Sequence, residues 1–175
     1  MPATPSHALV GFALAAWAQQ RPPIRRVCLA AAACAALPDI DVISWPLHIS
    51  NASLFAHRAI THSLLFALLG AMLATRVFFG GAEWAPSRAR IALILFLAVL
   101  SHACLDALTT YSVGVEFFAP FSQHRFRFLW TPLGDPQGRL AGQLIQEVFV
   151  VSLPAVALGW LGFQREDRAR SARHA

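Results

Sequence analysis

The chain has 175 residues, of which 57% are hydrophobic and 13% are charged, and its formal net charge is +5. Charged residues this scarce cannot cover a soluble globule of this size, so the composition excludes an ordinary water-soluble domain and favours a membrane protein. Every basic residue is arginine, and the arginines stand at the ends of apolar runs. The positive charge therefore does not indicate nucleic-acid binding, and no nucleic acid partner is expected.

Five apolar stretches predict the helices of a membrane bundle. In chain order they cover residues 8–18, 27–37, 64–79, 91–108 and 144–163. Only the last approaches the roughly 20 residues that a membrane crossing requires. The first two are short, so each must be extended through its flanks, tilted, or paired as a hairpin that does not fully cross. The predicted fold class is all-α, a polytopic membrane helix bundle of about four or five transmembrane segments.

The arginines between these stretches predict the orientation of the bundle. Ten lie on one side if all five stretches cross, and four lie on the other, namely Arg58, Arg125, Arg127 and Arg139. Because cytoplasmic loops carry the excess of arginine, the N-terminus is expected outside and the C-terminus in the cytoplasm of a bacterial inner membrane. We expect one membrane-embedded domain over residues 1–164 and a charged cytoplasmic tail over 165–175.

Seven ionisable side chains fall at the opposite, periplasmic ends of four predicted helices. They are His7, Asp39, Asp41, His57, His62, His102 and Asp106. Charged groups in or beside membrane helices are costly, so they are normally paired, line a cavity or bind an ion. The convergence of four histidines and three aspartates predicts a metal site.

The spacing of these residues supports a shared site. His102 and Asp106 are four residues apart in a helical run, which places both side chains on one helix face. Asp39 and Asp41 follow a proline, so we expect an extended segment in which both carboxylates point to the same side. His57 is expected in the loop before the third helix, with Thr61 as the N-cap of that helix.

Mixed imidazole and carboxylate ligands favour zinc, with manganese or iron as alternatives, and seven candidates suffice for one ion or two. Some of the seven are alternatively outer groups that orient the ligands. Arg58 lies beside the expected N-terminus of the third helix, where free N–H groups would suit a phosphate or a carboxylate.

Three sequence blocks resemble a known family. They are Leu-Pro-Asp-Ile-Asp at 37–41, His-Arg-Ala-Ile-Thr-His-Ser-Leu at 57–64 and Ser-His-Ala-Cys-Leu-Asp-Ala-Leu-Thr at 101–109. They resemble the LexA-regulated, membrane-bound metal-dependent hydrolases of bacteria, the YdjM-like family. The resemblance covers most of residues 1–130 and implies the same seven residues as metal ligands. It implies hydrolysis without defining a substrate, and the chain departs from some relatives at Val42 and in the loop over 110–113.

The leading hypothesis is hydrolysis of an ester or phosphoester by a metal-activated water, with Asp39 or Asp41 as general base. Arg58, Arg125 and Arg127 would bind the charge of the substrate. A site at the membrane surface favours a lipid or lipid-linked substrate. Two alternatives remain open: a metal or proton transporter, with ligands near the membrane midplane, and a structural or regulatory protein whose metal holds helix ends together.

Other polar residues carry ordinary interpretations. His48, His124 and His174 lack a partner at ligand spacing, and Asp135 lies in a turn rich in proline and glycine. Glu147 either faces the bundle interior or extends toward the membrane surface. The three cysteines lie in apolar segments without a CxxC pair, which predicts buried free thiols.

Overall fold

The computed structural model describes residues 3–19, 23–110, 113–134 and 139–171, the last six of these by their backbone alone. Six α-helices account for most of this part of the chain: α1 (Thr4–Ala18), α2 (Arg25–Ala36), α3 (Leu64–Phe78), α4 (Arg88–Ala107), α5 (Leu140–Glu147) and α6 (Leu153–Ser171). Short 3-10 helices η1 (Leu37–Ser44), η2 (Ile60–His62) and η3 (Ala82–Ser87) lie between them, and a π-helical turn η4 (Val148–Ser152) joins α5 to α6. The described residues contain two isolated β-bridges and no strand. The predicted all-α fold class is confirmed.

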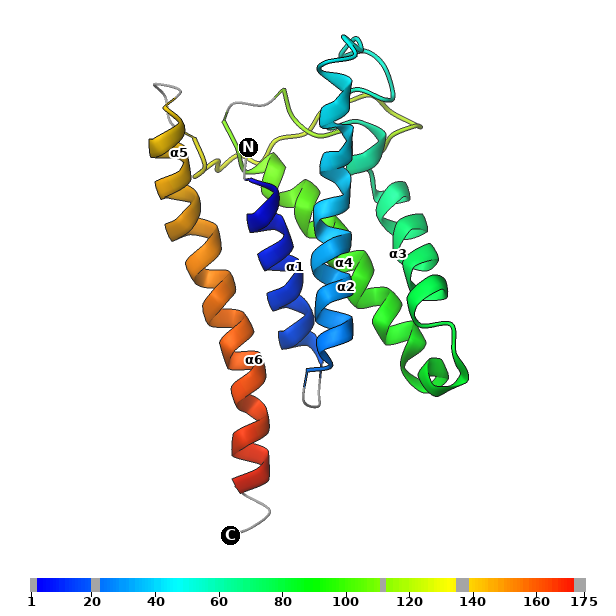
Figure 1. Cartoon of the computed structure of the whole chain (residues 1–175). Helices are drawn as coiled ribbons and strands as arrows, with labels where there is room; N and C mark the ends of the chain where they lie inside the picture. The colour runs from blue at the N-terminus through cyan, green and yellow to red at the C-terminus, as the bar shows by residue number, and fades with distance from the viewer. Residues whose placement is uncertain (1–2, 20–22, 111–112, 135–138, 172–175) are drawn as a thin grey trace.

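The helices form a bundle whose long axes run in roughly the same direction (Figure 1). α1 packs against α2, α4 and α6, and α4 packs against α2 and α3. The N-terminus and the connections that follow η1 and α4 lie at one end of the bundle, and the C-terminus lies at the other (Figure 1). Residues far apart in the sequence therefore meet at the N-terminal end.

Three helical stretches are long and apolar enough to cross a membrane: Arg25–Ser44, Ala82–Ala107 and Leu140–Arg165. The first of them combines α2 with η1. The short apolar stretch over 27–37 is therefore extended through its C-terminal flank, which is one of the three alternatives expected for it. α3 is a shorter apolar helix of 15 residues, and α1 also has 15 residues. The tail expected to begin at residue 165 starts within a helix, because α6 continues past residue 164 to Ser171.

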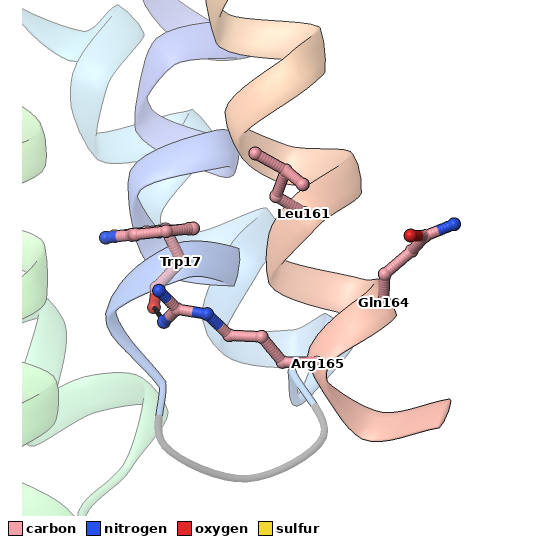
Figure 2. A pocket seen from close by; sticks show the side chains of 4 residues that line it. All are labelled: Trp17, Leu161, Gln164 and Arg165. Carbon is pink, nitrogen blue, oxygen red and sulfur yellow. Dashed lines mark hydrogen bonds between the residues drawn. The ribbon is translucent and has the colours of Figure 1, made fainter. Parts of the chain in front are cut away.

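Small residues bring α1 close to its neighbours. Ala15, Ala16 and Ala31 are completely buried in the core. A Cβ on Gly162 of α6 would lie 2.7 Å from the backbone oxygen of Ala16, so α6 approaches the backbone of α1 directly. Below this crossing the side chain of Arg165 lies over the ring of Trp17 (Figure 2). Interfaces of small residues allow such close helix packing in membrane proteins.

Gly11 and Gly70 provide a matched test of this packing. A Cβ at Gly11 would lie 2.5 Å from the oxygen of Ala31 and 2.6 Å from the Cβ of Ala35, whereas at Gly70 it would meet nothing within 4 Å. We expect Gly11→Ala to destabilise the bundle by about 1–3 kcal/mol, because α1 must move away from α2. Gly70→Ala should stabilise α3 by about 0.5–1 kcal/mol, because alanine loses less backbone entropy. Unfolding in detergent, followed by circular dichroism, measures both. Equal effects of the two substitutions would contradict the close packing of α1 on α2.

The predicted free thiols are confirmed. Cys28 and Cys34 are buried, Cys104 is partly buried, and none forms a disulfide.

Candidate metal centre

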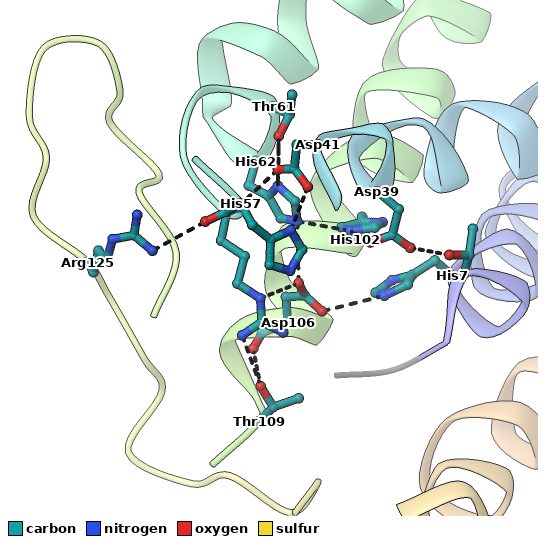
Figure 3. Close-up of polar contacts among 12 residues, drawn as sticks. His7, Asp39, Asp41, His57, Thr61, His62, His102, Asp106, Thr109 and Arg125 are labelled. Carbon is teal, nitrogen blue, oxygen red and sulfur yellow. Dashed lines mark hydrogen bonds and ion pairs between the residues drawn. The ribbon is translucent and has the colours of Figure 1, made fainter. Parts of the chain in front are cut away.

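The seven predicted side chains meet at the N-terminal end of the bundle (Figure 3). They come from the first turn of α1, from η1, from the loop before η2, from η2 itself and from the end of α4. Six of them are buried, and the side chain of His57 is 10% exposed. The six buried residues are His7, Asp39, Asp41, His62, His102 and Asp106. The predicted convergence of the helix ends is therefore present in the fold.

His102 has a defined tautomer in its neutral form. Its Nδ1 lies 2.7 Å from the carbonyl oxygen of Ala35, and because a carbonyl only accepts, Nδ1 carries the proton. In the 3-10 pattern the donor for this carbonyl would be residue 38, which is a proline without an N–H. The carbonyl is thus available to His102. Nε2 of His102 is left with a lone pair directed into the cluster.

The lone pair of His102 faces a carboxylate oxygen and a second imidazole nitrogen. Nε2 lies 3.4 Å from Oδ1 of Asp39 and 3.1 Å from Nε2 of His62. The same Nε2 atom of His62 lies 3.3 Å from Oδ2 of Asp106. A zinc–nitrogen bond of about 2.0–2.1 Å would place two tetrahedral ligand atoms roughly 3.3–3.4 Å apart. The observed separations therefore match the edges of a coordination shell.

Two overlapping groups have ligand atoms that all lie within 4.8 Å of one another. One consists of His7, Asp39 and His102, and the other of His62, His102 and Asp106. His102 belongs to both. The ring of His7 stacks on that of His102 at a centroid distance of 3.7 Å, and its Nε2 lies 3.5 Å from Oδ1 of Asp106.

Several buried atoms in these groups have no hydrogen-bond partner among the described protein atoms. They are both ring nitrogens of His7, Oδ1 of Asp39 and both carboxylate oxygens of Asp106. Buried polar atoms are costly unless they are satisfied. Imidazole nitrogens and carboxylate oxygens are also the donors that zinc accepts, so the set fits a divalent metal.

Asp41 has a different environment from the other aspartates. Oδ1 accepts from Nδ1 of His57 at 2.5 Å, and Oδ2 accepts from the backbone N–H of Arg58 at 3.0 Å and from the hydroxyl of Thr61. Nδ1 of His62 lies 3.1 Å from the same oxygen. Asp41 thus fixes the rings of two histidines and directs their Nε2 atoms away from itself. Carboxylates commonly orient metal-binding imidazoles in this way.

His57 and Asp41 belong to neither ligand group among the described residues. Because Nδ1 of His57 donates to Asp41, its Nε2 carries a lone pair, and this buried atom has no hydrogen-bond partner among the described protein atoms. The ring of His57 lies at the most exposed edge of the cluster, with its centroid 5.6 Å from that of His62.

Arg58 is the one predicted arginine that reaches the cluster. Its Nε lies 2.8 Å from Oδ2 of Asp106, an ion pair whose angle falls outside that of a hydrogen bond. Its Nη1 donates to the hydroxyl of Thr109 at 3.3 Å. Burial lowers the pKa of Arg58 from its ordinary value, and the Asp106 carboxylate opposes this shift. The backbone of Arg58 has a φ of 67°, a left-handed conformation that is uncommon outside glycine.

The other two predicted arginines are not paired with the side chains of the cluster, although Nη1 of Arg125 donates to the backbone carbonyl of His57 at 3.4 Å (Figure 3). Nη2 of Arg125 lies 2.9 Å from Oε1 of the buried Glu116 and donates to the carbonyl of Asn51 at 3.1 Å. Arg127 is exposed and donates to the carbonyl of Thr110 at 3.3 Å. A substrate-binding role for either remains a prediction.

Two local expectations were wrong. The segment after Pro38 is the 3-10 helix η1 and not an extended strand, so Asp39 and Asp41 enter different parts of the cluster. The N-cap of α3 is Ser63, whose hydroxyl accepts from the N–H of Phe66 at 3.1 Å. The hydroxyl of Thr61 instead donates to Asp41, a long-range contact that removes it from the capping position.

The structure adds residues that the sequence did not single out. The hydroxyl of Thr4 donates to Oδ2 of Asp39 at 2.5 Å. Its position one helical turn before His7 is the signal that would have indicated it. Glu147, for which two interpretations were open, faces the interior: it is 3% exposed and accepts from the N–H of Ala3 at 2.6 Å. This bond joins α5 to the N-terminus of α1, the helix that carries His7. Asp135 lies outside the described residues.

Asp41→Asn tests the orienting role of this carboxylate. Asparagine keeps the shape but turns an NH2 group toward hydrogen-bond donors, so at least one imidazole loses its support. We expect the affinity for a divalent metal to fall by about 10–100-fold, the usual effect of losing an outer partner. Chelator competition on purified protein measures it, with Glu116→Gln, which removes charge outside the cluster, as the matched control. Unchanged affinity in Asp41→Asn would show that Asp41 does not orient the ligands.

The fold and the cluster together define a class: a polytopic helical membrane protein with a buried histidine and aspartate centre at one end of its bundle. The chain belongs to the YdjM inner membrane protein family, whose model matches residues 1–167. It is 34% identical over 130 residues to the inner membrane protein YbcI of Escherichia coli strain K12, an alignment that covers 74% of each chain. No solved structure matches the chain significantly.

The family and the apolar helices support a location in the inner membrane. Neither the description of the family nor the name of the relative specifies a reaction.

Proposed function

We propose that this protein is a metal-dependent hydrolase that cleaves an ester or phosphoester of a lipid or lipid-linked substrate. The observation that carries the proposal is the lone pair of His102, which is fixed by Ala35 and faces Asp39 and His62. When bound there, a divalent metal, with zinc favoured over manganese and iron, supplies a hydroxide near neutral pH by lowering the pKa of a bound water.

The ligand geometry favours one ion at Nε2 of His102, the atom that the two ligand groups share and that is called the shared corner below. Nε2 of His102 belongs to both ligand groups, and one lone pair binds one metal. His62, His102 and Asp106 give three protein ligands, the number that leaves a fourth position for water in catalytic zinc sites. A second ion would take its ligands from the remaining unpartnered atoms of the other group, those of His7 and Asp39.

The two predicted general bases differ in how much of each carboxylate is engaged. Both oxygens of Asp41 accept hydrogen bonds from neighbouring groups. Asp39 uses Oδ2 for Thr4, while its Oδ1 has no hydrogen-bond partner among the described protein atoms and faces the cluster. Asp39 is therefore the favoured proton acceptor, and Asp41 is a positioning residue. Arg58 places a buried positive charge where negative charge would develop on the substrate.

The arginine distribution supports a periplasmic site. Arg58, Arg125 and Arg127 belong to the end of the bundle that holds the cluster, since they contact Asp106, His57 and Thr110, and the larger arginine group is expected at the other end. By the positive-inside rule the cluster then faces the periplasm. A lipid or lipid-linked phosphoester would reach this depth by lateral diffusion.

The positions of the ligands argue against a transporter. His102 and Asp106 stand in the last two turns of α4, which ends at Ala107, and His7 stands in the first turn of α1. Ion pathways in secondary transporters place their ligands near the membrane midplane, at broken helices. One observation favours a structural centre as the second candidate: His7, His102 and Asp106 are completely buried.

Turnover of a chromogenic phosphodiester and of lipid phosphoesters by purified, metal-loaded protein tests the proposal. We expect Asp39→Asn to lower kcat by about 100-fold to 10,000-fold, the range for losing a general base, while the bound metal is retained. His124→Ala, at an exposed ring outside the cluster, should keep full activity. Full activity of metal-free protein would contradict the proposal. Stoichiometric metal without turnover of any ester would support the structural candidate, and metal uptake into vesicles would support transport.

A further inference from the structure

Four arginines gather at the end of the bundle opposite the cluster, and each of them binds backbone carbonyls at the end of a helix. They are Arg26, Arg88, Arg90 and Arg165, and the carbonyls belong to the C-terminal ends of α1 and α3 and to the turn after α3. The last carbonyls of a helix carry partial negative charge, which explains the preference for arginine there. Within the part of the chain whose side chains are described, no carboxylate lies within 4 Å of these four side chains.

A hollow of about 150 Å³ opens between α1 and α6 at this end (Figure 2). It is lined by Trp17, Leu161, Gln164 and Arg165. The guanidinium carbon of Arg165 lies 3.4 Å from the centroid of the Trp17 ring, and Nη1 donates to the carbonyl of Trp17 at 3.4 Å. Of the five N–H donors of a guanidinium, this hydrogen bond uses one. The stack on Trp17 therefore holds an arginine whose other donors have no hydrogen-bond partner among the described residues.

The walls of the hollow are of two kinds. Leu161 is 42% exposed and Trp17 is 37% exposed, and they form an apolar side of the hollow. Further exposed apolar side chains of α6, Trp160 and Val156, stand nearer the N-terminal end of that helix. Gln164 and Arg165 form a polar side at the level where α1 ends. Because this level is at the end of the apolar helices, an amphipathic molecule of the membrane would match both sides at once.

We infer that this hollow binds the headgroup of an anionic phospholipid, with the phosphate at Arg165 and the acyl chains along the outer face of α6. The volume suits a phosphate group and not a whole lipid, since it corresponds to roughly five water molecules at about 30 Å³ each. Charge complementarity with the four arginines selects an anionic headgroup over a zwitterionic one. The site is at the other end of the bundle from the cluster and does not depend on the proposed hydrolysis.

Native mass spectrometry of the full chain in detergent, titrated with phosphatidylglycerol or phosphatidylcholine, tests the inference. We expect wild-type protein to prefer phosphatidylglycerol and Arg165→Gln to lose about fivefold in affinity for it, which corresponds to about 1 kcal/mol for one arginine at an anionic surface. Arg165→Lys keeps the charge and should retain the preference. Arg139→Gln is the matched control, because Arg139 stands at the N-terminus of α5, at the opposite end of the bundle, and has no role in the proposed hydrolysis.

Circular dichroism and elution volume establish that each variant is folded before the titration. An Arg165→Gln protein with the wild-type preference would overturn the inference, as would an equal loss in Arg139→Gln. Glycerol phosphate, which lacks acyl chains, should not compete at equimolar concentration. If it displaces the lipid completely, the hollow is a site for soluble phosphate compounds and not for a lipid.

Discussion

Replacing His102 by alanine is expected to lower the affinity of the protein for a divalent metal by more than about 100-fold. This exceeds the roughly 10–100-fold loss that follows when a residue that only orients a ligand is removed. His102 contributes the one atom that both ligand groups share, and its lone pair is aimed by the bond from Nδ1 to Ala35. Its Nε2 also lies 3.1 Å from Nε2 of His62, a second imidazole of the cluster. The metal content after dialysis, measured by elemental analysis, and chelator competition give the affinity.

The matched control is His124→Ala. The His124 ring packs on Phe126 at a centroid distance of 4.5 Å, outside the cluster, so its loss removes an imidazole without touching the ligands. Metal content should stay at the wild-type level in this variant. Retention of tightly bound metal by His102→Ala would show that the shared corner is not the binding site.

Arg58→Ala is expected to destabilise the metal-free protein by about 3–5 kcal/mol, the cost of removing one partner from a buried ion pair. The side chain of Arg58 is 4% exposed and that of Asp106 is not exposed, so water cannot solvate the carboxylate once the guanidinium is removed. Unfolding in detergent with a chelator present isolates this effect from metal binding. Arg127→Ala, which removes an exposed arginine with one hydrogen bond, should change stability by no more than about 0.5 kcal/mol.

A double variant separates the charge effect from the lost packing. Arg58→Met combined with Asp106→Leu removes both charges and keeps much of the volume, and such replacements of buried pairs are often neutral. We expect it to be more stable than Arg58→Ala alone. If the double variant is as unstable as the single one, the pair does not account for the loss.

The sequence predicted those features that depend on local pattern. The apolar runs predicted the helices. The positions of histidine and aspartate at four helix ends predicted that these side chains meet, because the up-and-down order of the helices brings those ends to one side of the membrane. The four-residue spacing of His102 and Asp106 placed both on one face of α4, and both are buried in the cluster.

Features that depend on tertiary contacts were outside the reach of the sequence. Pro38 was interpreted as the start of an extended segment, but the chain continues in a 3-10 helix whose missing N–H leaves Ala35 for His102. Thr61 and Ser63 both carry hydroxyls at the start of α3, and the bond of Thr61 to Asp41 decides which of them caps the helix. The division between ligands and orienting groups follows from such contacts.

X-ray absorption spectroscopy at the zinc edge, on wild-type protein loaded with one equivalent of zinc, tests the central claim most directly. The account predicts a shell of nitrogen and oxygen atoms at about 2.0–2.1 Å with the scattering of at least two imidazoles and no sulfur. A shell that contains sulfur at about 2.3 Å would place the metal at a cysteine instead, and failure to retain one equivalent of zinc would contradict a metal centre at this end of the bundle.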